Sequence, residues 1–108
     1  MLILDAEVCF DTPEINPNAL SHELSTNIIL RPAINFGNDI LFSGTLITDK
    51  KDAFLYRGRK YQLSIEMPTV ENEAFEEIKA LVVKDSLFII QLASRVIGQG
   101  KIIDYLYE

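Results

Sequence analysis

The stretch Leu87-Phe-Ile-Ile-Gln-Leu-Ala-Ser-Arg95-Val-Ile-Gly98-Gln-Gly100-Lys-Ile-Ile103 decides the fold of this 108-residue chain. Two apolar runs are joined by a short polar corner, and two closely spaced glycines follow the corner. Apolar runs of this length that are separated by turn residues are typical of a β-hairpin. We therefore expect the chain to close with two antiparallel strands, over residues 87–93 and 97–106.

Four stretches upstream of this hairpin also have strand character, either by period-two alternation or by continuous apolar sequence. They cover residues 4–10, 28–36, 39–48 and 61–67. Pro32 interrupts the second stretch, which marks an edge or a bulge, and Gly44 indicates a bend in the third. Because strand follows strand with no βαβ alternation, the sequence predicts an all-β barrel or sandwich.

Residues 72–82 have a different period, since their apolar residues recur at three- and four-residue spacing. This pattern predicts one short α-helix, with Asn72 as its N-cap. Four glutamates gather around its start: Glu71, Glu73, Glu76 and Glu77. Carboxylates in a first turn stabilise a helix, and this group offers an acidic surface to a basic protein partner. The alternative is a solvated helix face with no partner.

Composition limits the class of protein. With 48% hydrophobic residues, the chain has enough apolar material for one core, so we expect residues 1–108 to form a single β-barrel domain. Cys9 is the only cysteine, which excludes an intrachain disulfide. Acidic residues near the start and the lack of a long apolar run favour a cytoplasmic protein with no membrane segment. The formal charge of −6 disfavours non-specific binding to nucleic acid.

Several short motifs, in their order and spacing, resemble the C-terminal β-barrel domain of the elongation factor Tu family. The matching pieces are the Ala6-Glu7-Val8 strand, the Arg31-Pro32 pair, Gly58 before an alternating strand, and Arg95-x-x-Gly98-x-Gly100. The resemblance implies a six-stranded antiparallel barrel, in which the helix over residues 72–82 is an insertion. Because the chain has no phosphate-binding Gly-x-x-x-x-Gly-Lys-Ser/Thr loop, we expect no nucleotide hydrolysis.

In that family the barrel helps to hold the T-stem of aminoacyl-tRNA and contacts partner proteins. The resemblance therefore implies that Arg31 and the turn from Arg95 to Gly100 contact phosphate. A guanidinium beside the free backbone amides of Gly98 and Gly100 would suit this role. Alternatively, the two arginines pair with carboxylates of the barrel, and the glycines permit a bulge at a barrel corner.

A second basic group, Arg57, Arg59 and Lys60, lies beside Tyr56 and Tyr61. Positive charge interleaved with aromatic side chains is the composition of an RNA-binding surface. An exposed turn between two strands has the same composition, so both interpretations stay open.

Catalytic chemistry is not expected. His22 stands next to Glu23, and Cys9 has no basic neighbour in the sequence, so neither forms a convincing nucleophile–base pair. The glutamates of residues 71–77 lack the alternating ligand spacing and central glycine of a calcium loop. We therefore expect no enzyme activity, no cofactor and no metal.

The sequence thus favours a non-catalytic, stand-alone binding module that acts through protein–protein contacts. One alternative is an immunity or antitoxin-like protein that neutralises a basic toxin. A second alternative is a barrel that binds tRNA or another RNA.

Overall fold

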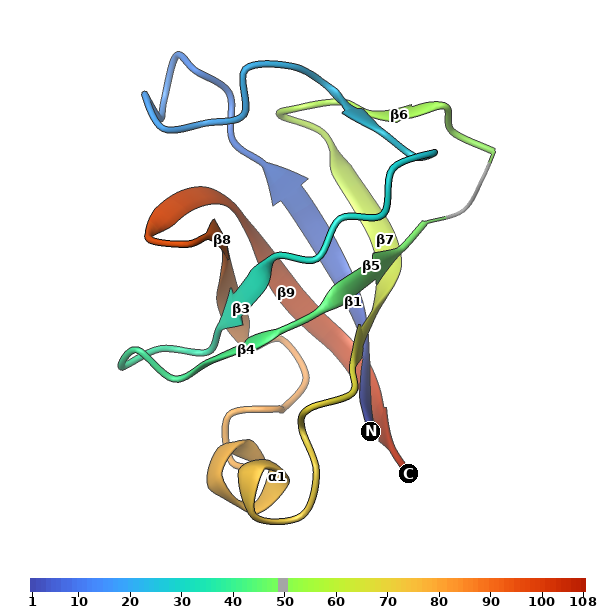
Figure 1. The fold of residues 1–108 in the computed structure, drawn as a ribbon, viewed down its shortest axis with the longest axis vertical. Coiled ribbons are helices and arrows are strands. Elements are labelled where there is room, and N and C mark those ends of the chain that lie inside the picture. Colours follow the sequence, from blue (N-terminus) through green and yellow to red (C-terminus); the bar gives the residue numbers. More distant parts are fainter. Residues whose placement is uncertain (49–50) are drawn as a thin grey trace.

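The computed structural model describes residues 1–48 and 51–108, and its main body is a nearly closed antiparallel barrel (Figure 1). The large sheet has the order β4-β3-β8-β9-β1-β7-β5, and all its neighbouring strands are antiparallel. Its strands are β1 (Leu2–Phe10), β3 (Ala33–Asn35), β4 (Leu41–Ser43), β5 (Thr45–Ile47), β7 (Lys60–Met67), β8 (Leu87–Leu92) and β9 (Arg95–Tyr107). The predicted all-β class, with an antiparallel barrel and one short helix, is confirmed.

The barrel closes through a bend at Gly44, between β4 and β5. β4 pairs with β3 at one edge of the sheet and β5 pairs with β7 at the other, so one bent segment joins the two edges. The backbone N–H of Gly44 donates to the carbonyl of Pro32 at 2.9 Å, and that of Leu46 donates to Leu30 at 3.0 Å. A Cβ on Gly44 would lie 2.6 Å from Cγ2 of Ile65, so the close approach requires glycine. The large sheet therefore has seven strands and not the six expected, because the strand expected over residues 39–48 is divided at Gly44 into β4 and β5.

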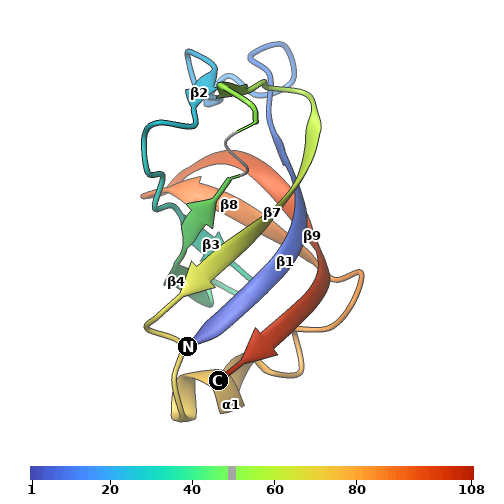
Figure 2. The ribbon, with the colours of Figure 1, turned by 90° about the vertical axis from the view of Figure 1, so that its right-hand side faces the viewer.

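Strand β1 is an interior strand of the sheet and lies between β7 and β9 (Figure 2). Its alternation is strict, because every second side chain from Leu2 to Phe10 is fully buried and those between them are partly exposed. Full burial of an aliphatic or aromatic side chain contributes about 1.5–3 kcal/mol each. The inward side chains of the large sheet, among them Ile34, Ile65 and Ile90, form one apolar core.

The prediction of one strand over residues 28–36 is largely wrong, since only residues 33–35 of this stretch form a strand, β3. Pro32 has no N–H to donate, and β3 begins directly after it. Ile28 and Ile29, expected inside a strand, are 65% and 67% exposed. A small second sheet that the sequence did not predict pairs β2 (Leu24–Ser25) with β6 (Phe54–Leu55).

Helix α1 (Glu73–Ile78) is shorter than the expected 72–82 and lies at the end of the barrel near both chain ends (Figures 1 and 2). Ile78 is fully buried in the core, and the ring of Phe75 stacks on Tyr107 of β9 with centroids 3.9 Å apart. The helix therefore covers the barrel end and does not project from it. Within residues 1–48 and 51–108, no helix has the length and apolar character needed to cross a membrane.

Asn72 occupies the N-cap position, but its expected capping bond is absent. Its backbone has φ 48°, and its side chain makes no cap hydrogen bond. The backbone N–H of Asn72 instead donates to the hydroxyl of Tyr107 at 2.7 Å. The Asn72 side chain therefore does not cap the helix, and the contact with β9 satisfies the N–H of Asn72 itself.

Candidate functional site

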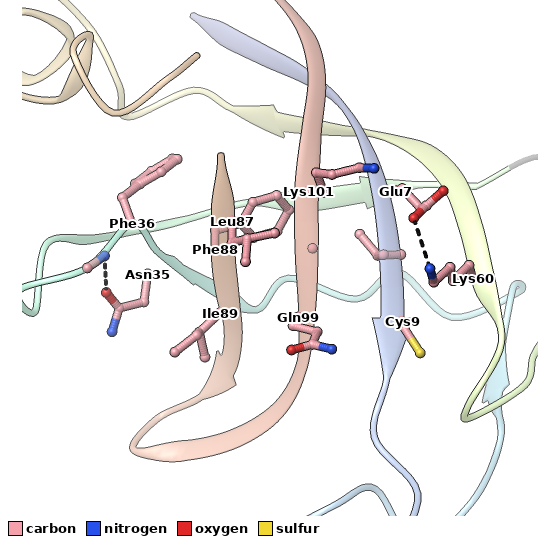
Figure 3. A pocket seen from close by; sticks show the side chains of 13 residues that line it. Glu7, Cys9, Asn35, Phe36, Lys60, Leu87, Phe88, Ile89, Gln99 and Lys101 are labelled. Atoms are coloured by element: carbon pink, nitrogen blue, oxygen red, sulfur yellow. Dashed lines mark hydrogen bonds and ion pairs between the residues drawn. The ribbon is translucent and has the colours of Figure 1, made fainter. Parts of the chain in front are cut away.

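A groove of about 460 Å³ crosses the outer face of the barrel, over β8, β9, β1 and β7 (Figure 3). Its outward side chains include Glu7, Cys9, Lys60, Leu87, Ile89 and Lys101. Successive residues of a strand point to opposite faces of a sheet, so these positions alternate with the residues of the core. Three core residues, Val8, Phe36 and Phe88, also line the groove, so its floor adjoins the core.

One half of the groove is apolar. Leu87 and Ile89 on β8 are 75% and 42% exposed, while Phe88 and Ile90 between and beside them are buried. The outward positions of the neighbouring β9 that line the groove are polar. β8 therefore presents to solvent two side chains of the type that usually fills a core.

The other half of the groove holds charge. Oε1 of Glu7 lies 3.8 Å from Nζ of Lys60, and Lys101 lies directly opposite Glu7 in the pairing of β1 with β9. In Figure 3 the ammonium of Lys101 is directed toward the same carboxylate. Two lysines around one glutamate leave one positive charge in excess, on a chain whose formal charge is −6.

Asn35 fixes the wall of the groove at the end of β3. Its Nδ2 donates to Oε1 of Gln91 at 2.7 Å, and its Oδ1 accepts from the N–H of Gly37 at 2.8 Å. Gln91 is 9% exposed and also donates to the carbonyl of Ala93 at 3.0 Å. The wall is therefore held by satisfied polar groups and is preformed.

The four glutamates proposed for partner binding lie at and around α1, away from the groove. The N-terminal amine lies 2.7 Å from Oε1 of Glu71, and Lys79 lies 2.6 Å from Oε2 of Glu76. Glu73 and Glu77 are exposed. The acidic surface exists, but half of its carboxylates have a counter-charge within the chain.

Arg57 of the basic group is used inside the fold. Its backbone N–H donates to Oε2 of Glu23 at 2.6 Å, its guanidinium contacts Oε1 of the same carboxylate at 3.0 Å, and it donates to the carbonyl of Leu20 at 2.7 Å. These contacts hold the pKa of the Glu23 carboxyl below its usual value, because they stabilise its charged form. The hydrogen bond from the backbone N–H of Arg57 has the largest effect, and the bond from its guanidinium has the next largest. Arg59 lies over the ring of Tyr56, with 5.0 Å from Cζ to the centroid.

Arg95 is not in a turn, since it is the first residue of β9 and the corner of the hairpin is formed by Ala93 and Ser94. Its guanidinium donates to the backbone carbonyls of Asn18 and Ala19. The expected pairing of Arg95 with a carboxylate is therefore wrong, because loop carbonyls take its place. Arg31 is exposed.

Gly98 and Gly100 lie inside β9 and not in a turn with free amides. A Cβ on Gly98 would lie 2.6 Å from the carbonyl oxygen of Cys9, and one on Gly100 would lie 2.2 Å from Cζ of Phe88. A bulge adjoins Gly98, because the register with β8 shifts next to it. The irregularity concerns Gly98 alone, since Gly100 lies opposite Phe88 in regular register, and both glycines allow close packing in the barrel wall.

The described residues contain no group of three or more His, Cys, Asp or Glu that could hold a metal ion. Sequence reasoning missed the groove, although Leu87 and Ile89 stand in the outward phase of a strand, which was a usable signal. Of the sequence-predicted residues, Lys60 and Gly100 line it. Comparison with protein-family models finds no match to this chain, and comparison with curated proteins finds none either.

Proposed function

We propose that this chain is a non-catalytic binding module, a stand-alone relative of the C-terminal barrel of elongation factor Tu, which acts in the cytoplasm through contacts with a protein partner. The groove is the observation that supports a protein partner best. Protein interfaces combine an apolar centre with a polar rim, and here Leu87 and Ile89 line the same groove as the Glu7–Lys60 ion pair. Exposed apolar side chains that adjoin a groove are a common feature of interaction sites.

The relation to the elongation factor barrel is supported by how the motif residues are used. Arg95, Gly98 and Gly100 all belong to the final hairpin of an antiparallel barrel, as the resemblance implies, although they lie in strand β9 and not in its turn. Gly98 and Gly100 are positions where a side chain would collide with the neighbouring strand. The motif therefore reflects requirements of the barrel wall, and it supports a shared architecture more than a shared RNA site.

RNA binding is the weaker alternative, because much of the positive charge serves the fold. The guanidinium of Arg57 is bonded to Glu23 and that of Arg95 to backbone carbonyls. Arg31, Arg59 and Lys60 remain as exposed cations on an acidic protein. We expect a gel shift with tRNA at low salt to give no complex, since few phosphate contacts are offered. A salt-sensitive complex would favour the RNA alternative.

An immunity-like function is the second candidate, supported by the way in which α1 is held. The stacking of Phe75 on Tyr107 fixes the helix against the barrel, so Glu73 and Glu77 are presented on a supported surface. A basic toxin would be attracted to such a surface. Changing Glu71, Glu73, Glu76 and Glu77 together to lysine should then abolish binding to a co-encoded basic toxin, and unchanged binding would exclude this function.

The main proposal is tested by affinity capture with three purified versions of the chain. The first is the natural sequence, the second carries Leu87→Asp and Ile89→Asp, and the third carries Ile47→Asp as a matched control. Ile47 is also an outward strand residue and is 43% exposed. We expect a protein partner to be retained by the natural chain and the control but lost from the groove variant. Equal retention by all three would refute binding through the groove.

A further inference from the structure

The residues of the groove form two rows that cross the strands. In the first row Leu87 lies opposite Lys101, which lies opposite Glu7. In the second row Ile89 lies opposite Gln99, and Cys9 lies between Gln99 and Lys60. Each row therefore has an apolar side chain on β8 at one end and a charged side chain at the other, Glu7 on β1 in the first row and Lys60 on β7 in the second.

The apolar and positive members of the first row, Leu87 and Lys101, are close together. Neighbouring strands are about 4.8 Å apart, so a group resting on Leu87 is one strand spacing from the base of Lys101. An extended chain advances about 3.3 Å per residue, so an occupant that reaches both must have its apolar and charged groups within two residues. This spacing restricts the sequence of the occupant.

The charge of the occupant follows from the balance in the groove. Lys60 and Lys101 stand on either side of the single carboxylate of Glu7. A basic group would meet two ammonium groups here, whereas a carboxylate would meet an excess of positive charge. The rest of this acidic chain repels a carboxylate, so its binding would be confined to the groove.

The length of the groove favours a peptide over a compact small molecule. It runs from β8 to β7, which is three strand spacings or about 14 Å, the length of about four extended residues. We infer that the groove receives an extended segment of the protein partner in which a large apolar side chain stands within two residues of an aspartate, a glutamate or a terminal carboxylate. This inference rests on the proposed protein-binding function and adds the chemistry of the partner.

A selection from random dodecapeptides displayed on phage, against the immobilised protein, tests this inference. Sequences enriched on the natural chain should contain Leu, Ile or Phe within two positions of Asp or Glu. The enriched peptide should bind about tenfold or more weakly to Leu87→Asp and to Lys101→Met, a loss typical of central interface residues. Binding to Ile47→Asp should be unchanged. Both altered groove positions are at least partly exposed, so the variants should keep the fold, which far-UV circular dichroism checks.

Cys9 supplies an independent readout, because it is the only cysteine and lines the groove. A bound peptide should slow the reaction of its thiol with a disulfide reagent. Enrichment of basic peptides, no enrichment at all, or a peptide that leaves the reactivity of Cys9 unchanged would overturn the inference. So would tight binding of decanoate without any peptide, which would make the groove a small-molecule site. A captured partner that the enriched peptide does not displace would refute only the inference, whereas failure to capture any partner would refute the proposed function as well.

Discussion

The substitution Gly100→Ala should destabilise the barrel strongly, because the ring of Phe88 occupies the space of the new methyl group. A Cβ at this position would lie 2.2, 2.5 and 2.8 Å from three ring carbons. Phe88 is 2% exposed and lies directly opposite Gly100 in the register, so the ring cannot move without losing its packing. Overpacking costs about 1–3 kcal/mol and occasionally more, and we expect about 3 kcal/mol here.

The assay is urea denaturation followed by circular dichroism, with thermal melting as a second measurement. A loss of about 3 kcal/mol should lower the melting temperature of a domain of this size by roughly 12–24 °C. Phe88→Ala alone should cost about 3–5 kcal/mol. The double variant should be no less stable than Phe88→Ala, since removal of the ring abolishes the collision. Additivity of the two changes within about 0.5 kcal/mol would refute this reasoning.

Three further perturbations test other parts of the structure. Gly44→Ala places a methyl group 2.6 Å from a side chain of β7 at the barrel closure, and it should lower the free energy of unfolding by about 1–3 kcal/mol in urea denaturation. Asn35→Ala leaves the side-chain oxygen of the buried Gln91 without its donor and should cost about 1–3 kcal/mol; an unchanged melting temperature would contradict the bond. Glu23→Gln should destabilise the chain at neutral pH. Because the folded pKa of Glu23 is lowered, its contribution is present above the unfolded pKa of 4.5 and is lost as pH falls through the folded pKa, so the melting curves of the two proteins should converge in acid.

The sequence predicted those parts of the fold in which local pattern and tertiary environment agree. The alternation in residues 4–10 marks β1 correctly because one side of that strand faces the core throughout. The bend at Gly44 was predicted as well, since glycine in a strand marks a close approach. What the sequence did not indicate is that this bend closes the barrel, because closure depends on pairing with two different strands, β3 before the bend and β7 after it.

Most errors arose where a tertiary contact overrides a local signal. Asn72 has the right residue type for a cap, yet its side chain makes no cap hydrogen bond and its backbone N–H is bonded to the hydroxyl of Tyr107. Gly98 and Gly100 read as turn residues, but they permit packing within β9. The groove was missed because its two halves come from strands whose register cannot be read from one sequence. Even so, the alternation of β8 places Leu87 on the outer face of its strand, and this position predicts an exposed apolar side chain.

Site-directed photo-crosslinking in cell extract tests the central claim, binding of a protein partner through the groove, most directly. The crosslinker is placed next to the groove (the rim position) by Gln62→Cys in a Cys9→Ser background, because Gln62 is exposed and lies opposite Glu7, which lines the groove. The control position is Asn27→Cys in the same background, in the exposed loop after β2. The account predicts a protein adduct from the rim position alone, which disappears when Leu87→Asp is added. Adducts to RNA, or protein adducts that persist with Leu87→Asp, would contradict it.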